Sequence, residues 1–224
     1  MKQGTAQAAE GDQTTMAQPR PLTQRQLQQR DRVLTTTRQM LAENGYEGLQ
    51  MRSLAEAAGV SLMTLYNRFS NKNDLILLAL EDLLTDLGER ADGSGSQGIE
   101  LVIETFEVVA EQILTTPKYA KAMALLLFNA QPDSPIVATL LNDTVELSRT
   151  RIIAMQALGE VGEALDPATL ARNLGVCGWS TILLWMKGLI SDAEFRKEYR
   201  RAPLFVLAAA MTPRARKRYA QELA

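Results

Sequence analysis

Apolar residues recur at intervals of three and four along most of the chain, and no stretch alternates with a period of two. This spacing puts apolar side chains on one face of an α-helix and predicts an all-α protein. A first helix is expected to begin with a capping box formed by Thr23 and Gln26 and to end at Asn44-Gly45. Its buried face is expected to hold Val33, Leu34, Thr37, Met40 and Leu41.

Capping residues, prolines and glycines divide the rest of the chain into further helices. These are expected at about 51–58, 62–69, 71–88, 98–115, 117–129, 135–158, 167–187 and 192–211, with a short basic helix from 213. Ser134 and Asp166 each precede a proline and are expected to cap the helices that follow. The loop 93–98 has the letters GxGxxG, but a helix precedes it, so we interpret it as an interhelix linker rather than a dinucleotide site.

Charge is distributed unevenly along the chain, although the formal net charge is only −2. Residues 16–72 carry seven arginines and one lysine against four carboxylates, a net charge of +4, so the remainder carries −6. Such segregation is typical of a protein whose N-terminal part contacts phosphate while its body does something else.

Composition excludes several classes of function. The chain has no histidine, which removes histidine-dependent catalysis and the most common transition-metal ligand, so we expect no enzyme, metal site or cofactor. Cys177 is the sole cysteine, and we interpret it as a small buried hydrophobe rather than a redox sensor. Apolar runs too short for a bilayer and a polar start without a signal-peptide core indicate a cytoplasmic protein with no membrane partner.

Residues 52–72, RSLAEAAGVSLMTLYNRFSNK, have the pattern of a helix-turn-helix. This motif needs a small residue facing the second helix, a glycine in the turn and apolar residues that fix the angle between the two helices. Ala55, Gly59 and Val60 meet those needs in order. Leu54, Ala58, Leu65 and Phe69 are expected to form the shared core.

The remaining side chains of this motif are expected to face outwards and to contact double-stranded DNA. Two hydroxyl groups and two cationic groups can donate hydrogen bonds to phosphate oxygens. The hydroxyls belong to Thr64 and Tyr66, and the cations are Arg68 and Lys72. Arg52 is suited to guanine, Asn67 to a base edge, and Leu62 or Met63 to a thymine methyl group. Taken singly, Tyr66 is equally a half-buried core aromatic, and the basic residues equally form a solvated face, but their joint spacing favours DNA binding.

Three segments together resemble the DNA-binding signature of the TetR (tetracycline repressor) family: Gly45-Tyr46, Met51-Arg52-x-Leu54-Ala55, and Gly59-Val60-Ser61-x-x-Thr64-Leu65-Tyr66-x-x-Phe69-x-x-Lys72. The resemblance covers Arg32 to about Leu80, and the later helices resemble the family in number, length and order alone. Gln50, Met63 and Arg68 depart from the family pattern, and all three leave the core intact. Gln50 implies a weaker cap on the first helix of the motif, whereas Met63 and Arg68 bear on the operator sequence.

The resemblance implies an N-terminal three-helix DNA-binding domain and a larger C-terminal helical domain for ligand binding and dimerisation. The expected boundaries are a disordered leader at 1–22, the helix-turn-helix domain at 23–72 and the ligand-binding domain at 73–224. Apolar stretches at 177–189 and 203–211 would be exposed in a monomer, so we expect a homodimer through the helices around 167–188 and 192–211.

Candidates for the ligand pocket are large apolar side chains, although such side chains at helical spacing are more often ordinary core. They are Phe106, Met123, Leu127, Phe128, Met155, Trp179 and Trp185. Four carboxylates at helical spacing, Glu100, Glu104, Glu107 and Glu111, are interpreted as a solvated face rather than a cation site.

The predicted function is that of a repressor that binds a pseudo-palindromic operator as a homodimer and is released by a small hydrophobic ligand. The long helix from Asn71 is the expected lever between the two sites. Two other classes of protein fit the sequence less well. A helical adaptor for a protein partner would leave the pattern at 52–72 unexplained, and a helical enzyme would lack a nucleophile beside a base.

Overall fold

The computed structural model describes residues 23–223, and every regular element within them is helical. The predicted all-α class is confirmed, with one isolated β-bridge between Val161 and Met211. The predicted leader at 1–22 lies outside the described residues.

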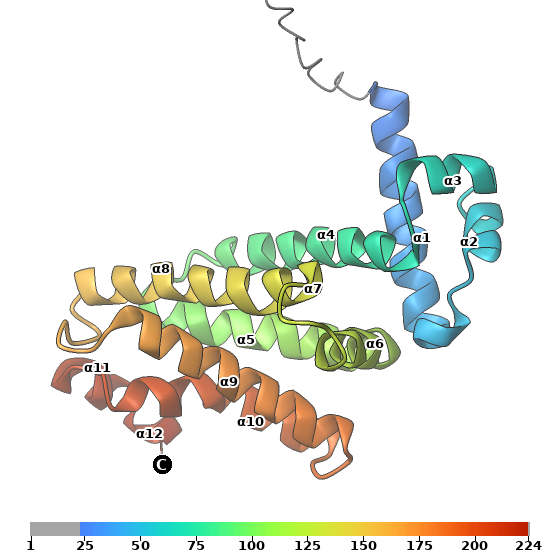
Figure 1. The fold of residues 1–224 in the computed structure, drawn as a ribbon. Coiled ribbons are helices and arrows are strands. Elements are labelled where there is room, and N and C mark those ends of the chain that lie inside the picture. The colour runs from blue at the N-terminus through green and yellow to red at the C-terminus, as the bar shows by residue number, and fades with distance from the viewer. Residues whose placement is uncertain (1–22, 224) are drawn as a thin grey trace, which may run out of the picture.

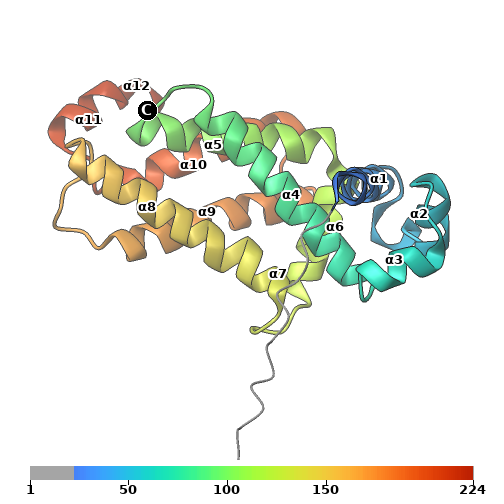
Figure 2. The same ribbon diagram turned by 90° about the horizontal axis from the view of Figure 1, so that it is seen from above.

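The helices form an N-terminal unit and a longer body (Figure 1). The N-terminal unit comprises α1 (Gln24–Gly48), α2 (Met51–Ala57) and α3 (Leu62–Arg68). The body comprises α4 (Lys72–Asp92), α5 (Gly98–Thr115), α6 (Pro117–Phe128), α7 (Pro135–Val137), the π-helical segment η1 (Ala138–Asp143), α8 (Thr144–Ala157), α9 (Pro167–Met186), α10 (Asp192–Ala208), α11 (Pro213–Arg218) and α12 (Ala220–Leu223). Figure 2 shows α2 and α3 at one end of the molecule and α11 and α12 at the other.

Helix α1 begins with the predicted capping box of Thr23 and Gln26. The predicted stop at Gly45 is a kink, because this glycine has a φ of 68° and the helix then continues to Gly48. Val33, Leu34, Thr37 and Leu41 are buried as predicted, and Met40 is partly buried against the same core.

Three expected features of the body are corrected by the structure. Gly88 does not end α4, which continues to Asp92. Ser134 does not cap the next helix, since its side chain makes no capping hydrogen bond and its hydroxyl is buried without a partner among the described residues. The single helix expected over 135–158 instead contains the wider π-helical segment η1. Asp166, by contrast, caps α9 by accepting from the backbone N–H groups of Ala168 and Thr169.

One hydrophobic core extends from the N-terminal unit into the body. It includes Leu34, Leu54, Leu65 and Phe69 from the N-terminal unit, Leu75, Ile76, Ala79 and Leu80 from α4, and Tyr119, Ala122, Met123 and Leu127 from α6. Polar contacts reinforce it: Arg38 Nη1 donates to Asp82 Oδ2 at 2.7 Å, and Lys118 Nζ donates to the Glu43 carbonyl at 2.5 Å. Helix α1 therefore packs directly on α4 and α6, and α2 and α3 are joined to the body through the same core.

Two further hydrophobic clusters hold the rest of the body together. One joins α5, α8, α9 and α10 around Ile103, Ile152 and Leu204, and the other lies between α5, α9 and α10 around Phe195. None of the helices in residues 23–223 has both the length and the apolar content needed to cross a bilayer.

The two serines predicted to precede helices differ in a way that stability measurements detect. Ser61 Oγ accepts from the Thr64 backbone N–H at 3.0 Å, so Ser61→Ala should lower the free energy of unfolding by about 1 kcal/mol. Ser134→Ala should cause no loss, because its hydroxyl makes no described hydrogen bond. Urea denaturation followed by circular dichroism measures both, and equal losses would contradict the assignment of the caps.

Candidate DNA-binding surface and ligand pocket

The helix-turn-helix is built as the sequence predicts. Gly59 has a φ of 66°, a conformation that glycine adopts without a side-chain clash, and the Val60 backbone N–H donates to the Ala55 carbonyl at 2.9 Å. The predicted shared core is confirmed, since Leu54, Ala58, Leu65 and Phe69 are all buried. This packing fixes α3 on α2 and determines which of its side chains face outwards.

The solvent-facing side of helix α3 carries both apolar and polar side chains. Met63 is 69% exposed, Tyr66 49% and Leu62 36%, and Asn67 and Arg52 are also exposed. Thr64, Arg68 and Lys72 are partly buried. Large exposed side chains on a short packed helix are costly without a partner, so this face is a candidate binding surface.

Three of the predicted phosphate donors already have partners within the protein. The hydroxyl of Thr64 shares a 2.7 Å hydrogen bond with Ser61, and Arg68 Nη1 donates to the Gln26 carbonyl at 3.0 Å. Lys72 Nζ donates to the Tyr46 carbonyl at 2.6 Å and lies 4.0 Å from the centre of the Tyr46 ring. Burial lowers the pKa of Lys72, and the nearby Glu47 carboxylate partly opposes this.

The hydrogen bond from Arg68 to Gln26 also adds a region that lies outside the predicted motif. It joins residues 42 positions apart and brings the first turn of α1 beside α3. The exposed Arg25 therefore borders the predicted DNA-binding surface. The excess of arginines before the motif was the only signal for it in the sequence.

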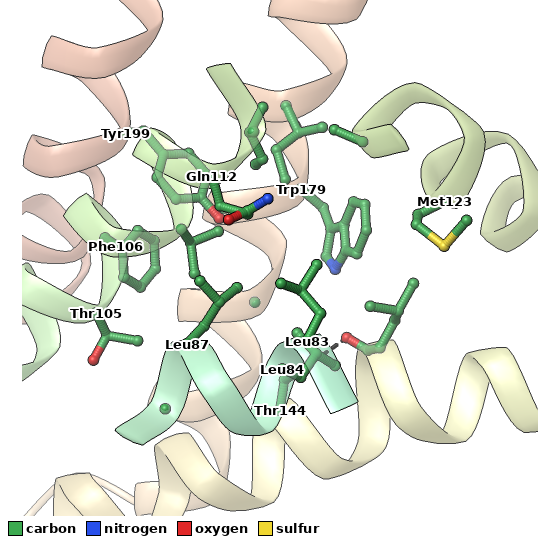
Figure 3. A pocket seen from close by; sticks show the side chains of 18 of the residues that line it. Leu83, Leu84, Leu87, Thr105, Phe106, Gln112, Met123, Thr144, Trp179 and Tyr199 are labelled. Carbon is green, nitrogen blue, oxygen red and sulfur yellow. Dashed lines mark hydrogen bonds between the residues drawn. The ribbon is translucent and has the colours of Figure 1, made fainter. Parts of the chain in front are cut away.

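A cavity of about 260 Å³ lies inside the body, lined by residues of α4, α5, α6, α8, α9 and α10 (Figure 3). Its walls are mainly apolar and include Leu83, Leu84, Leu87, Val109 and Ile113. Thr105 and Phe106 lie at one end of it, and Met123 of α6 lies at the other. The cavity therefore extends towards the helix on which α1 is packed.

The structure places three of the seven candidate pocket residues on this cavity and four elsewhere. Phe106, Met123 and Trp179 line it, and their contact with a ligand remains a prediction. The others are corrected. Leu127 and Met155 are buried in core clusters, Phe128 is 53% exposed at the end of α6, and Trp185 packs on Phe195 with its Nε1 donating to Asp192 at 2.8 Å. In each case, helix packing turned the side chain away from the cavity.

Polar residues that the sequence did not single out also line the cavity. Arg151 Nη1 donates to the Thr105 hydroxyl at 2.6 Å, whereas Arg149, two residues earlier, has a 39% exposed side chain outside the cavity and pairs with Glu146. The local sequence does not indicate which of these two arginines lines the cavity. Tyr119 is 4% exposed, and its hydroxyl has no hydrogen-bond partner within 23–223. Burial strongly raises the pKa of this phenol.

The solvated face expected for the carboxylates of α5 is present in part, since Glu107 and Glu111 are exposed and Glu100 and Glu104 are partly buried. Glu107 pairs with Arg200 at 2.9 Å, and Glu111 pairs with Arg90 at 2.8 Å. Glu104 and Glu100 accept from the Ser96 and Tyr219 hydroxyls, respectively. They hold α5 to its neighbours on both sides. The loop 93–98 connects α4 to α5, as its interpretation as a linker requires.

Residues 33–79 match the family model described as bacterial regulatory proteins, tetR family. Over 179 residues, the chain is 25% identical to the HTH-type transcriptional repressor KstR of Mycolicibacterium smegmatis, covering 77% of this chain and 83% of that protein.

Solved structures share the fold over most of the chain. The fatty acid degradation regulator FadR from Bacillus halodurans has a TM-score of 0.64 and 19% identity, covering 79% of this chain and 97% of that chain. Thermus thermophilus FadR, a TetR family transcriptional repressor solved in complex with lauroyl-CoA, has a TM-score of 0.62 and 20% identity, covering 82% and 97%. These likenesses establish the three-dimensional arrangement and leave the ligand of this chain open.

Cys177 on α9 is half-buried, and desolvation raises the pKa of its thiol. The thiolate is the reactive form, so alkylation by iodoacetamide should be slow at neutral pH. Its rate should rise with pH, with a midpoint above that of the same cysteine in urea-unfolded protein. Mass spectrometry of quenched samples measures the midpoint. A midpoint below that of the unfolded chain would indicate an activated thiol and contradict the interpretation as a buried hydrophobe.

Proposed function

Because the chain belongs to the TetR family of bacterial regulatory proteins and is a DNA-binding transcriptional regulator, we propose that it is a repressor that binds its operator as a homodimer and is released by a small hydrophobic ligand. The observation that carries the proposal is the outward face of α3, with Met63, Tyr66 and Asn67 exposed on a helix that is otherwise fixed in the core. A bacterial repressor that binds chromosomal DNA acts in the cytoplasm.

On DNA, each α3 enters a major groove. Asn67 reads a base edge, Arg52 pairs with guanine, and Leu62 or Met63 contacts a thymine methyl group. The phosphates are contacted by Tyr66, Thr64, Arg68 and Lys72. Arg68 and Lys72 do so through N–H groups that are not used in their hydrogen bonds within the protein. Two copies related by a two-fold axis read half-sites about 34 Å apart, which makes the operator a pseudo-palindrome.

Dimerisation is supported by the apolar surface of α9, α10 and the turn between them. Val176, Leu183 and Leu184 on α9 are 67%, 40% and 43% exposed, and Leu189 and Phe205 are 70% and 50% exposed. Val176 and Leu183 are two turns apart and therefore lie on the same side of α9. A second copy packed in an isologous four-helix arrangement covers this surface at both α9 and α10.

Ligand release is supported by the position of the cavity. Leu80, Leu83, Leu84 and Leu87 of α4 line it, and the same helix begins at Lys72, directly after α3. A ligand that binds more tightly to a conformation with displaced α4 helices shifts the dimer away from the α3 separation that fits DNA. The mainly apolar walls favour a ligand with an apolar chain, and the lauroyl group of the lauroyl-CoA bound by the Thermus thermophilus protein is an example of such a chain.

Selection from a pool of random DNA duplexes at about 150 mM salt should enrich a two-fold symmetric site. On that site, Asn67→Ala should weaken binding by about 1–3 kcal/mol and relax the preference at one position in each half-site, because a base contact is lost. Affinity for a scrambled duplex should not change, which provides the control. Enrichment of no sequence at any salt concentration would count against an operator-binding repressor.

Leu184→Glu should convert the dimer into a monomer, because it buries an uncompensated charge in the proposed interface. Leu125→Glu is the matched control, since this leucine is 55% exposed on α6, outside the interface, and its variant should remain dimeric. Sedimentation velocity at micromolar protein measures both. A monomeric unmodified protein, or an equal effect of the two substitutions, would refute this interface.

A further inference from the structure

The cavity in the body has one charged residue among the described side chains that line it, namely Arg151. Its side chain is only 12% exposed. Removing most of a guanidinium group from water costs free energy unless an anion or hydrogen bonds replace the lost hydration. Its carboxylate partner is Asp92, at 3.1 Å from Nη2, whose own side chain is 64% exposed and therefore well solvated. Screening by water weakens that pair.

The guanidinium keeps donors for another partner. Its described hydrogen bonds use one N–H of Nη1, to Thr105, and one of Nη2, to Asp92, out of five. The Thr105 hydroxyl in turn donates to the Leu101 carbonyl at 2.7 Å, so its lone pairs face the arginine and hold it in place. Arg151 is thus anchored at one end of the cavity rather than left to swing into solvent.

The cavity has the cation of Arg151 at one end and mainly apolar walls, although polar side chains such as Gln112 and Thr144 also line it. Figure 3 shows Thr105, the partner of Arg151, at the end opposite Met123. Between them lie Leu84, Leu87 and Trp179. A fully apolar ligand would cover Arg151 without supplying a partner, whereas a ligand with an acidic head would satisfy both ends.

We propose that the ligand of this cavity is an amphipathic carboxylic acid. Its ionised carboxylate pairs with Arg151, and its apolar chain extends past Trp179 towards Met123. This rests on the proposed function, since it specifies the ligand class of the same site. A carboxylate accepts two parallel N–H bonds from the planar guanidinium fork, which makes arginine selective for this head group. The incoming carboxylate competes with Asp92, which is exposed enough to return to water.

Direct binding by isothermal titration calorimetry tests the proposal on the full chain, with decanoate and 1-decanol as probes of equal chain length. Decanoate should bind about tenfold or more tightly than 1-decanol, because a charged hydrogen-bonded pair is gained. Arg151→Gln should abolish this preference and leave 1-decanol affinity unchanged. Arg149→Gln, on the same helix but outside the cavity, is the matched control and should keep the preference.

Two further variants keep the test decisive. Asp92→Asn removes the competing carboxylate and should therefore increase the affinity for decanoate. If Arg151 only stabilised the fold, this substitution would not increase the affinity for decanoate. Arg151→Lys keeps the charge without the planar fork and should retain part of the preference. It replaces Arg151→Gln if that variant does not fold by circular dichroism.

Equal affinities for the two probes, tighter binding of 1-decanol, or no saturable binding of decanoate would each overturn the proposal. Operator binding, measured on the same preparations by fluorescence anisotropy, reports separately on the proposed function. A protein that binds its operator and is released by a neutral apolar compound would keep that function while the acid-specific site is discarded.

Discussion

The continuous hydrophobic core between the helix-turn-helix and the body is the constraint on which the rest of the structure depends. Leu34, Leu65 and Phe69 pack in one cluster with Leu75 of α4 and Tyr119 of α6. Burial of such side chains contributes roughly 1.5–3 kcal/mol each, so the N-terminal unit cannot swivel on α4 without a large loss. A change in the position of α4 is therefore transmitted to α3 instead of being absorbed by a flexible link.

Helix α4 belongs to both sites. Its first half carries Leu75, Ile76 and Ala79 into the core shared with the helix-turn-helix, and its second half carries Leu83, Leu84 and Leu87 onto the cavity. Arg38, paired with Asp82, holds α1 near the point where the two halves meet. Ligand binding can affect DNA binding only if the ligand binds more tightly to one position of α4 than to another. Because α4 contacts both the cavity and the core of the N-terminal unit, a shift of this helix changes both sites.

The cavity combines an apolar interior with a single anchored cation. Arg151 and Arg149 differ by two positions on α8, which turns their side chains in opposite directions, one towards Thr105 and the other towards Glu146 in solvent. A buried guanidinium is costly unless it is paired, and the structure retains it at the end of a space that is otherwise hydrophobic. That combination suits a ligand with an acidic head and an apolar body better than a purely apolar one.

The sequence by itself determined the fold class, the helix-turn-helix and most helix boundaries, because these follow from local spacing. The capping box at Thr23 and the turn at Gly59 act within a few residues, and the structure has both. Only the tertiary structure decided the cavity, because the face that each apolar helix turns inwards depends on its neighbours. Trp179 and Trp185 look alike in sequence, yet one lines the cavity and the other packs on Phe195. Contacts between distant residues, such as Arg68 with Gln26, leave no trace in local spacing, since packing alone brings them together.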